Sequence, residues 1–120
     1  SLALQQGAIH ALRHCAAWPR TLHPVYRERR DRVLSVLRSD GWSIPTPEMA
    51  LYLWLPLPER LRQQGLNDET LVTRILQSSG VALTPGSGFG PAGRDWLRMA
   101  LVRPVDELEQ AAHRLLDALR

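Results

Sequence analysis

The chain has 120 residues, of which 44% are hydrophobic and 22% are charged, and its formal net charge at pH 7 is +3. This is the length of one domain with ordinary globular composition, which excludes a disordered or fibrous protein. All fifteen residues counted as Lys+Arg are arginine. Without lysine, the chain cannot form a Schiff base on a lysine side chain and has no P-loop lysine.

Signals for export or membrane insertion are missing from the sequence. The N-terminal residues lack a basic region followed by an apolar stretch, and no apolar run approaches the ~18 residues that cross a bilayer. The single cysteine, Cys15, cannot form an internal disulfide, which fits a reducing compartment. We therefore expect a cytoplasmic protein without a membrane partner. A net charge of +3 is also too small to favour nucleic acid as a partner.

Two helices are expected in the first forty residues. Apolar residues recur near the N-terminus at helical spacing, and these are Leu4, Ala8, Leu12 and Cys15. The first helix should end at Trp18-Pro19, because the residue before a proline avoids the α region. The second helix should run from about Pro24 to Asp40, with Gly41 as the residue that ends it.

The rest of the chain predicts a small α/β (α+β) domain. The expected elements are an extended segment over 43–47, a largely buried strand over 50–55, a short helix or loop over 61–66, a helix from Asn67 to Gly80, a short strand over 81–84, a loop over 85–93, a strand over 96–102 and a last helix beginning near Pro104. The buried stripe of that last helix is Leu108, Ala112, Leu115 and Leu119. This order predicts a mainly antiparallel sheet flanked by helices.

One charged residue, Arg98, lies in the middle of the expected strand over 96–102. Alternation places Trp96, Arg98, Ala100 and Val102 on one face of the strand, and Leu97, Met99 and Leu101 on the other. Because a guanidinium cannot lose its charge, Arg98 has an acidic partner, lies at an open edge, or binds a ligand carboxylate through two parallel hydrogen bonds. The glycine-rich loop over 85–93 favours the ligand, since it would allow close approach to the backbone. Arg98 is therefore the candidate binding residue.

The same loop contains G-x-G-x-x-G from Gly88 to Gly93, yet we expect no dinucleotide site there. That fingerprint needs a helix beginning at the glycines. Here Pro91 interrupts the segment and a strand follows within a few residues. A tight turn that positions Phe89 and the next strand is the simpler explanation.

Neither histidine nor cysteine predicts a reactive site. His10 and His14 have a spacing that could bind zinc, but no third ligand lies at a suitable spacing, so a solvated helix face is expected and no metal. Cys15 is on the stripe expected to face the core, which predicts an unreactive thiol. No catalytic residue is assigned, because the sequence contains no complete active site.

Charged residues cluster over 27–32 and could form a nucleic-acid patch. However, Glu28 with Arg32 and Arg27 with Asp31 are spaced for i,i+4 ion pairs. We therefore expect an exposed face that neutralises itself.

Taken in order and spacing, several segments resemble the C-terminal small domain of fold type I, class I/II pyridoxal-phosphate aminotransferases. These segments are Leu-Gln-Gln-Gly-Ala over 4–8, Tyr-Arg-Glu-Arg-Arg-Asp over 26–31, Ala-Leu-Tyr-Leu-Trp-Leu-Pro over 50–56, Gly-Val-Ala-Leu-Thr-Pro-Gly-Ser-Gly-Phe-Gly over 80–90 and Leu-Arg-Met-Ala-Leu-Val over 97–102. The resemblance implies that residues 1–120 are this substrate-side domain, and that Arg98 binds the substrate α-carboxylate. Within this family, the chain most resembles bacterial enzymes of lysine biosynthesis that act on diaminopimelate or its N-succinyl derivative.

The resemblance also implies a cofactor and partners. The parent enzyme would use pyridoxal 5'-phosphate to move an amino group between an amino acid and a 2-oxo acid. The attachment lysine and the other cofactor-binding residues belong to a large domain, and no position of this chain matches them. This chain alone would therefore be inactive, and its partners would be its own large domain and, in a homodimer, a second copy.

Two other hypotheses stay open. The chain could be the aminotransferase-like, effector-sensing domain of a bacterial transcription regulator, in which case a DNA-binding domain would precede it. A self-standing interaction module would require residues 1–120 to be a complete gene product, and the lack of an initial Met argues against that.

Overall fold

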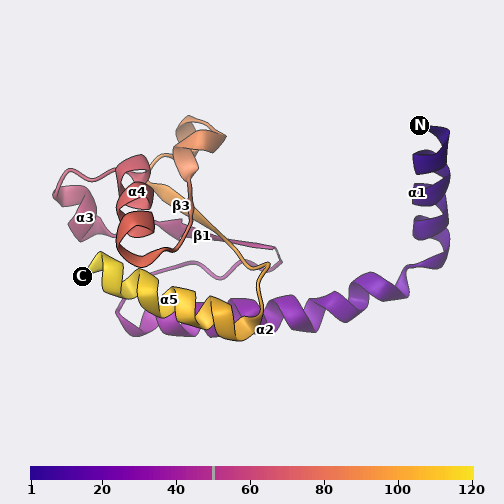
Figure 1. Ribbon diagram of the computed structural model, residues 1–120, viewed down its shortest axis with the longest axis horizontal. Coiled ribbons are helices and arrows are strands. Elements are labelled where there is room, and N and C mark those ends of the chain that lie inside the picture. Colours follow the sequence, from indigo (N-terminus) through magenta and orange to yellow (C-terminus); the bar gives the residue numbers. More distant parts are fainter. Residues whose placement is uncertain (50) are drawn as a thin grey trace.

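Helices alternate with the strands of one small sheet (Figure 1). The computed structural model describes residues 1–49 and 51–120. The helices are α1 (Leu2–His14), α2 (Ala17–Ser39), α3 (Glu59–Gln63), α4 (Asp68–Ser79) and α5 (Val105–Leu119), and the strands are β1 (Tyr52–Pro56), β2 (Thr84–Pro85) and β3 (Trp96–Ala100). Two short 3-10 turns, η1 (Gly86–Phe89) and η2 (Pro91–Gly93), lie between β2 and β3. Helices around an antiparallel sheet confirm the predicted fold class.

The three strands have the order β1-β3-β2, and both pairs are antiparallel. The strand predicted over 50–55 is observed as β1, and Ala50 lies outside the described residues. The prediction over 81–84 is reduced to the two residues of β2, and the one over 96–102 to β3. The sheet is therefore shorter than expected, with β3 at its centre.

One face of this sheet packs on the helices and forms a single core. Its buried sheet residues include Leu53, Leu55, Leu97 and Met99. The helical residues in the same core include Val33 and Leu37 of α2, Leu71 and Ile75 of α4, and the predicted stripe of α5. Figure 1 shows α5 lying along the second half of α2. Only alternate residues of β1 are fully buried, so the prediction of a largely buried strand holds for one of its faces.

The first helix ends earlier than predicted and the second begins earlier. α1 stops at His14, and Trp18-Pro19 lies in the first turn of α2 rather than at the end of α1. A proline is tolerated there because the first N–H groups of a helix have no partner within the helix. α2 then continues through Pro24, which has no N–H to donate to the preceding turn.

α1 and the N-terminal half of α2 project away from the rest of the molecule (Figure 1). No residue of α1 is buried, and Leu4 and Leu12 are 76% and 83% exposed. The prediction that Cys15 faces the core is therefore wrong, and its thiol is exposed. The apolar stripe is real, but no described element of this chain covers it. Among the described residues, no helix is long and apolar enough to cross a membrane.

The predicted ion pairs within 27–32 are replaced by others. Arg32 pairs with Glu109 of α5, and Arg30 pairs with its neighbour Asp31 at 2.7 Å. The hydrogen bond from Arg30 also lowers the pKa of the Asp31 carboxyl. The i,i+4 rule failed because α5 lies beside α2 and offers Arg32 a partner from a distant part of the sequence.

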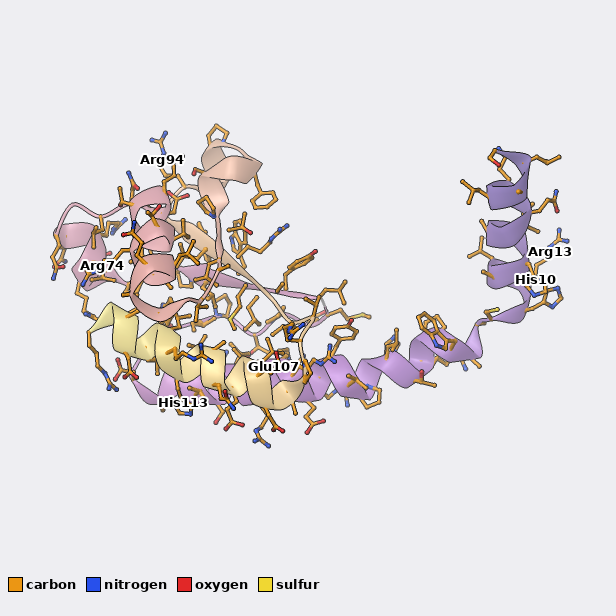
Figure 2. The ribbon with its side chains drawn as sticks, viewed as in Figure 1. His10, Arg13, Arg74, Arg94, Glu107 and His113 are labelled. Carbon is orange, nitrogen blue, oxygen red and sulfur yellow. The ribbon has the colours of Figure 1, made fainter. Side chains whose placement is uncertain are left out.

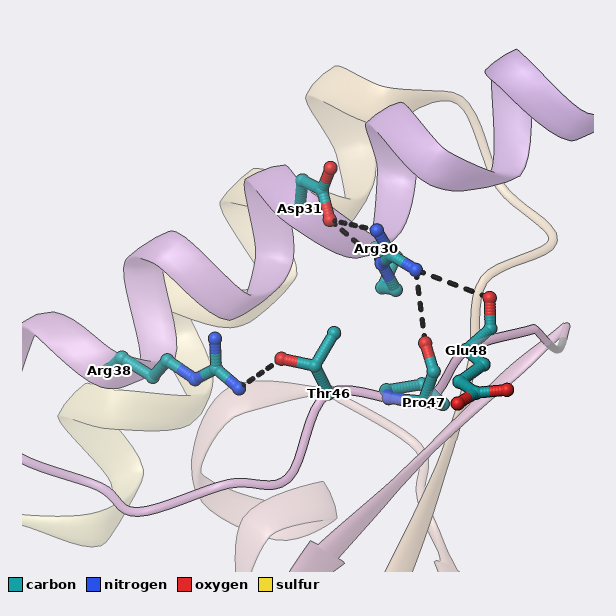
Figure 3. Close-up of polar contacts among 6 residues, drawn as sticks. All are labelled: Arg30, Asp31, Arg38, Thr46, Pro47 and Glu48. Carbon is teal, nitrogen blue, oxygen red and sulfur yellow. Dashed lines mark hydrogen bonds and ion pairs between the residues drawn. The ribbon is translucent and has the colours of Figure 1, made fainter.

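Arginines of α2 also hold the segment that leads into the sheet. Arg38 donates to the carbonyl of Ile44 at 3.2 Å and to the hydroxyl of Thr46 at 2.6 Å, and Arg30 donates to the carbonyl of Pro47 at 3.0 Å. Figure 3 shows Arg30 and Arg38 reaching this segment from α2. Their side chains thus take the place of secondary structure over 42–49, the anchored segment.

Candidate functional site

Arg98 lies at the centre of the sheet, on the face that the helices leave uncovered. Its neighbours across the two strand pairs are Trp54 of β1 and Thr84 of β2. The residues on either side of it, Leu97 and Met99, are buried in the core. The predicted alternation of β3 is therefore confirmed, and it directs Arg98 away from the core.

Two aromatic rings from different elements contact the Arg98 guanidinium. Its central carbon, Cζ, lies 4.4 Å from the ring centroid of Tyr52 in β1 and 4.5 Å from that of Phe89 in η1. Both distances are within the range of a cation–π interaction, in which the negative face of the ring attracts the cation. The positive charge is thus stabilised by groups that leave its N–H donors unoccupied.

The acidic partner that could have explained Arg98 is not found among residues 1–49 and 51–120. The ion pairs of that part of the chain involve Arg30, Arg32, Arg62, Arg103 and Arg120. None of the described buried side-chain nitrogens or oxygens lacks a hydrogen-bond partner. The unpaired nitrogens of Arg98 therefore reach solvent, where a ligand carboxylate could accept two parallel hydrogen bonds.

Aromatic side chains gather beside Arg98 on the open face of the sheet. Trp54 stacks on Trp96 with ring centroids 5.9 Å apart and 15° between the planes, and it meets Phe89 edge-on at 5.9 Å. Tyr52 is 39% exposed and Phe89 is 55% exposed. We call Tyr52, Trp54, Phe89 and Trp96 the aromatic surface.

The glycine-rich loop owes its shape to a backbone contact between two glycines. A Cβ on Gly86 would lie 2.1 Å from the Gly93 oxygen, and a Cβ on Gly93 would lie 2.0 Å from the Gly86 oxygen, so neither position accepts a side chain. Gly90, between the two 3-10 turns, has a φ of 114°, which favours glycine. The segment over 86–93 contains two short 3-10 turns and no α-helix, in agreement with the prediction of a turn that positions Phe89.

The N-terminus of α4 fixes the loop from the other side. The helix begins next to Asn67 as predicted, and the Asn67 side chain caps it by accepting a hydrogen bond from the Thr70 backbone. The next residue, Asp68, is 2% exposed and accepts a 2.7 Å hydrogen bond from the backbone N–H of Ser87 in η1. Burial raises the pKa of the Asp68 carboxyl, but its hydrogen bonds, those from Ser87 first, outweigh burial and leave that pKa below its ordinary value. Asp68 therefore holds, as a carboxylate, the turn that carries Phe89.

The remaining sequence candidates do not converge on a second site. His10 and His14 lie on α1 with ring centroids 4.7 Å apart, and Figure 2 shows His10 and Arg13 on this projecting helix. Within the described part of the chain, no group of three metal-ligating side chains occurs. Two hollows, of about 500 and 430 Å³, lie at the end of α5 and beside α2, and Arg98 lines neither.

Comparison with known proteins places the chain in a family. Residues 3–115 match the sequence profile described as "Aminotransferase class I and II". The LL-diaminopimelate aminotransferase of Oleidesulfovibrio alaskensis is 40% identical over 113 residues, which are 94% of this chain and 28% of that protein. The chain belongs to the class I and II aminotransferase family.

Solved structures agree with this assignment. A "probable N-succinyldiaminopimelate aminotransferase" from Thermus thermophilus superimposes with a TM-score of 0.79 and 40% identity, covering 92% of this chain and 28% of that one. An aminotransferase from Staphylococcus aureus gives a TM-score of 0.83 at 29% identity, covering 96% of this chain and 29% of that one. The chain thus spans less than a third of the length of the relatives it matches.

Sequence reasoning named Arg98 as a candidate but not the groups around it. Tyr52 and Asp68 were not singled out, and Phe89 was expected only as a residue positioned by its turn. Alternation in β1 carried a signal for Tyr52, because Leu53 and Leu55 on either side of Trp54 define the buried face. Nothing in the sequence indicated that Asp68 would reach Ser87.

Proposed function

We propose that this chain is the C-terminal, substrate-side domain of a pyridoxal-phosphate-dependent aminotransferase, and that Arg98 binds the substrate α-carboxylate. The observation that carries the proposal is a guanidinium on an open sheet face, contacted by two aromatic rings and by no carboxylate of the described residues. Two parallel hydrogen bonds from Arg98 would fix the orientation of the substrate and exclude amines without a carboxylate.

The substrate class follows from the names of the relatives. Those reported above are named for LL-diaminopimelate and N-succinyldiaminopimelate, which carry the α-amino and α-carboxylate groups that the proposal requires. We propose one of these two compounds as the amino donor and a 2-oxo acid as the acceptor. A homodimeric parent and a cytoplasmic location stay predictions. The relatives are aminotransferases and give no support to the hypothesis of a transcription regulator.

The residues of this chain do not fit the attachment of pyridoxal phosphate. The cofactor forms its imine on a lysine, and the sequence contains none. We therefore assign no cofactor contact and no chemical step to residues 1–120. The proposed contribution of this domain is limited to binding and orienting the substrate.

The experiment introduces the substitution Arg98→Lys into the full-length protein that contains this chain. Lysine keeps the charge but loses the planar pair of donors, so we expect KM to rise and kcat/KM to fall by the equivalent of about 2–4 kcal/mol. Kinetics are measured with LL-diaminopimelate and its N-succinyl derivative. Arg74→Lys on the exposed surface of α4 is the matched control and should change neither constant.

Unchanged kinetics of the Arg98→Lys variant on an α-carboxylate substrate would overturn the proposed role. The cofactor assignment is tested separately by borohydride reduction and peptide mapping of the same protein. A phosphopyridoxyl group on a side chain of residues 1–120 would contradict it.

A further inference from the structure

The aromatic contacts of Arg98 raise a question that binding alone does not answer, namely what keeps a long, flexible side chain in one position before a ligand arrives. Most arginines of this domain that make long-range contacts are held in position by hydrogen bonds from their own N–H donors. Arg29 donates to the carbonyl of Leu101 at 3.0 Å, and Arg30 to that of Pro47 at 3.0 Å. Such a bond would remove from Arg98 the donors that a carboxylate needs.

We propose that Tyr52 and Phe89 are positioning residues, which hold the Arg98 guanidinium through their ring faces and thereby keep its N–H donors free for a carboxylate. This inference rests on the proposed function of Arg98 and extends it to two further residues. A ring face attracts the cation without accepting its N–H groups in strong hydrogen bonds. It can therefore fix the charge and leave the hydrogen-bonding edges available.

The two rings are independent supports, because they come from different elements. Tyr52 begins β1, two residues from the position paired with Arg98, so the strand register sets its place. Phe89 ends η1, a turn that the Asp68 carboxylate and the Gly86–Gly93 contact hold in place. A side chain contacted from two fixed elements loses less conformational entropy when it binds a ligand.

Within the described residues, the Phe89 ring is not enclosed by the core. Phe89 is 55% exposed, although a phenyl ring is ordinarily buried in a core. Its aromatic and cationic contacts are the Arg98 guanidinium at 4.5 Å and the edge-on Trp54 at 5.9 Å. Among the described residues, the cation is therefore a principal partner of this ring.

The test compares ring-removing with ring-keeping variants in the full-length enzyme. Tyr52→Leu and Phe89→Leu keep apolar volume but lose the ring face, whereas Tyr52→Phe and Phe89→Tyr keep the ring. Each leucine variant should lower kcat/KM for an α-carboxylate substrate about 3- to 10-fold, chiefly through KM. The ring-keeping variants should stay within about 2-fold of the wild type.

Selectivity separates positioning from structure. The ratio of kcat/KM for N-succinyldiaminopimelate to that for Nα-succinyllysine, whose free amine has no carboxylate on the same carbon, should fall in the leucine variants, because only the first compound presents an α-carboxylate to Arg98. Tyr26→Leu is the matched control, since it removes a ring that lies 5.1 Å from a different guanidinium, that of Arg29. This control should leave the ratio unchanged.

Three outcomes would overturn the inference while the proposed function stands. They are wild-type kinetics in both leucine variants, an equal loss for the amino acid and the amine, or a loss in Tyr52→Phe as large as in Tyr52→Leu. If Arg98→Lys itself has no effect, the proposed function fails first. Should Tyr52→Leu not fold, the more exposed Phe89 pair decides the question alone.

Discussion

Two irregular segments of this domain are held in place by opposite means. The anchored segment over 42–49 depends on arginine side chains, as Arg30 and Arg38 donate to its carbonyl and hydroxyl oxygens. The glycine-rich loop over 85–93 accepts no hydrogen bond from an arginine side chain of the described residues. It is held by the backbone contact between Gly86 and Gly93 and by the hydrogen bond from Ser87 to Asp68.

The difference explains why the loop beside Arg98 does not occupy its donors. A chain with fifteen arginines offers many candidate carboxylate sites, but an arginine whose donors already hold the backbone is structural. Arg98 lies beside a loop whose backbone is held without the N–H donors of Arg98, so these donors stay free. Among the described arginines whose donors are free, Arg98 is the one that lies in a strand, so donor occupancy and position in the sheet together identify it.

The largest expected effect is on the loop that needs no arginine. Gly93→Ala would place a Cβ 2.0 Å from the Gly86 oxygen, and because both partners are backbone the loop must move. We expect the free energy of unfolding to fall by about 3 kcal/mol or more. Gly88→Ala in the same loop is the control, since its Cβ would meet nothing within 4 Å. Equal stability of the two variants, measured by urea denaturation, would refute this account of the loop.

The next effect compares an anchoring arginine, Arg30, with Arg98. Arg30→Met removes the donors to Pro47 and Asp31, and the free energy of unfolding should fall by about 2 kcal/mol. Arg98→Met removes no hydrogen bond within the described residues, and methionine still packs on the rings, so the loss should stay below about 1 kcal/mol. For activity we expect the reverse: Arg98→Met should lower kcat/KM more than Arg30→Met does. A greater loss of stability in Arg98→Met, measured by the same denaturation, would mean that Arg98 is structural.

Local signals in the sequence predicted the elements whose ends are determined by single residues. α4 begins after Asn67 and ends before Gly80, because a capping side chain and a left-handed glycine act on the backbone next to them. Alternation along β3 predicted that Arg98 lies on the face away from the core, and this pattern also depends only on neighbouring residues. Each of these predictions needed only neighbouring residues.

Contacts between distant residues could not be predicted in this way. Arg32 pairs with Glu109, which is 77 positions away, and not with Glu28 on its own helix. The stripe of α1 predicted burial, but an amphipathic pattern does not indicate whether the covering surface belongs to the same chain. The rings around Arg98 likewise come from two elements that only the fold brings together.

The smallest expected effect concerns pH and the carboxylate that holds the loop. Because the pKa of Asp68 is lowered in the folded protein, its contribution to stability is fully present above the ordinary aspartate pKa and is lost as the pH falls through the lowered one. Asp68→Asn should therefore reduce the free energy of unfolding by about 1 kcal/mol at neutral pH, where the carboxylate is the better acceptor for the Ser87 N–H.

The same variant should show a flatter decline of stability below about pH 4, so that its curve approaches the wild-type curve in acid.

Asp31→Asn is a useful contrast. The pKa of Asp31 is also lowered, by the hydrogen bond from Arg30, but its carboxylate is exposed and holds no loop. Salt should weaken the contribution of Asp31 and leave that of Asp68 nearly unchanged, because a buried hydrogen bond is little screened. A parallel pair of pH curves for wild type and Asp68→Asn would show that the loop does not depend on this charge, and the second support of Phe89 would then have to be the glycine contact alone.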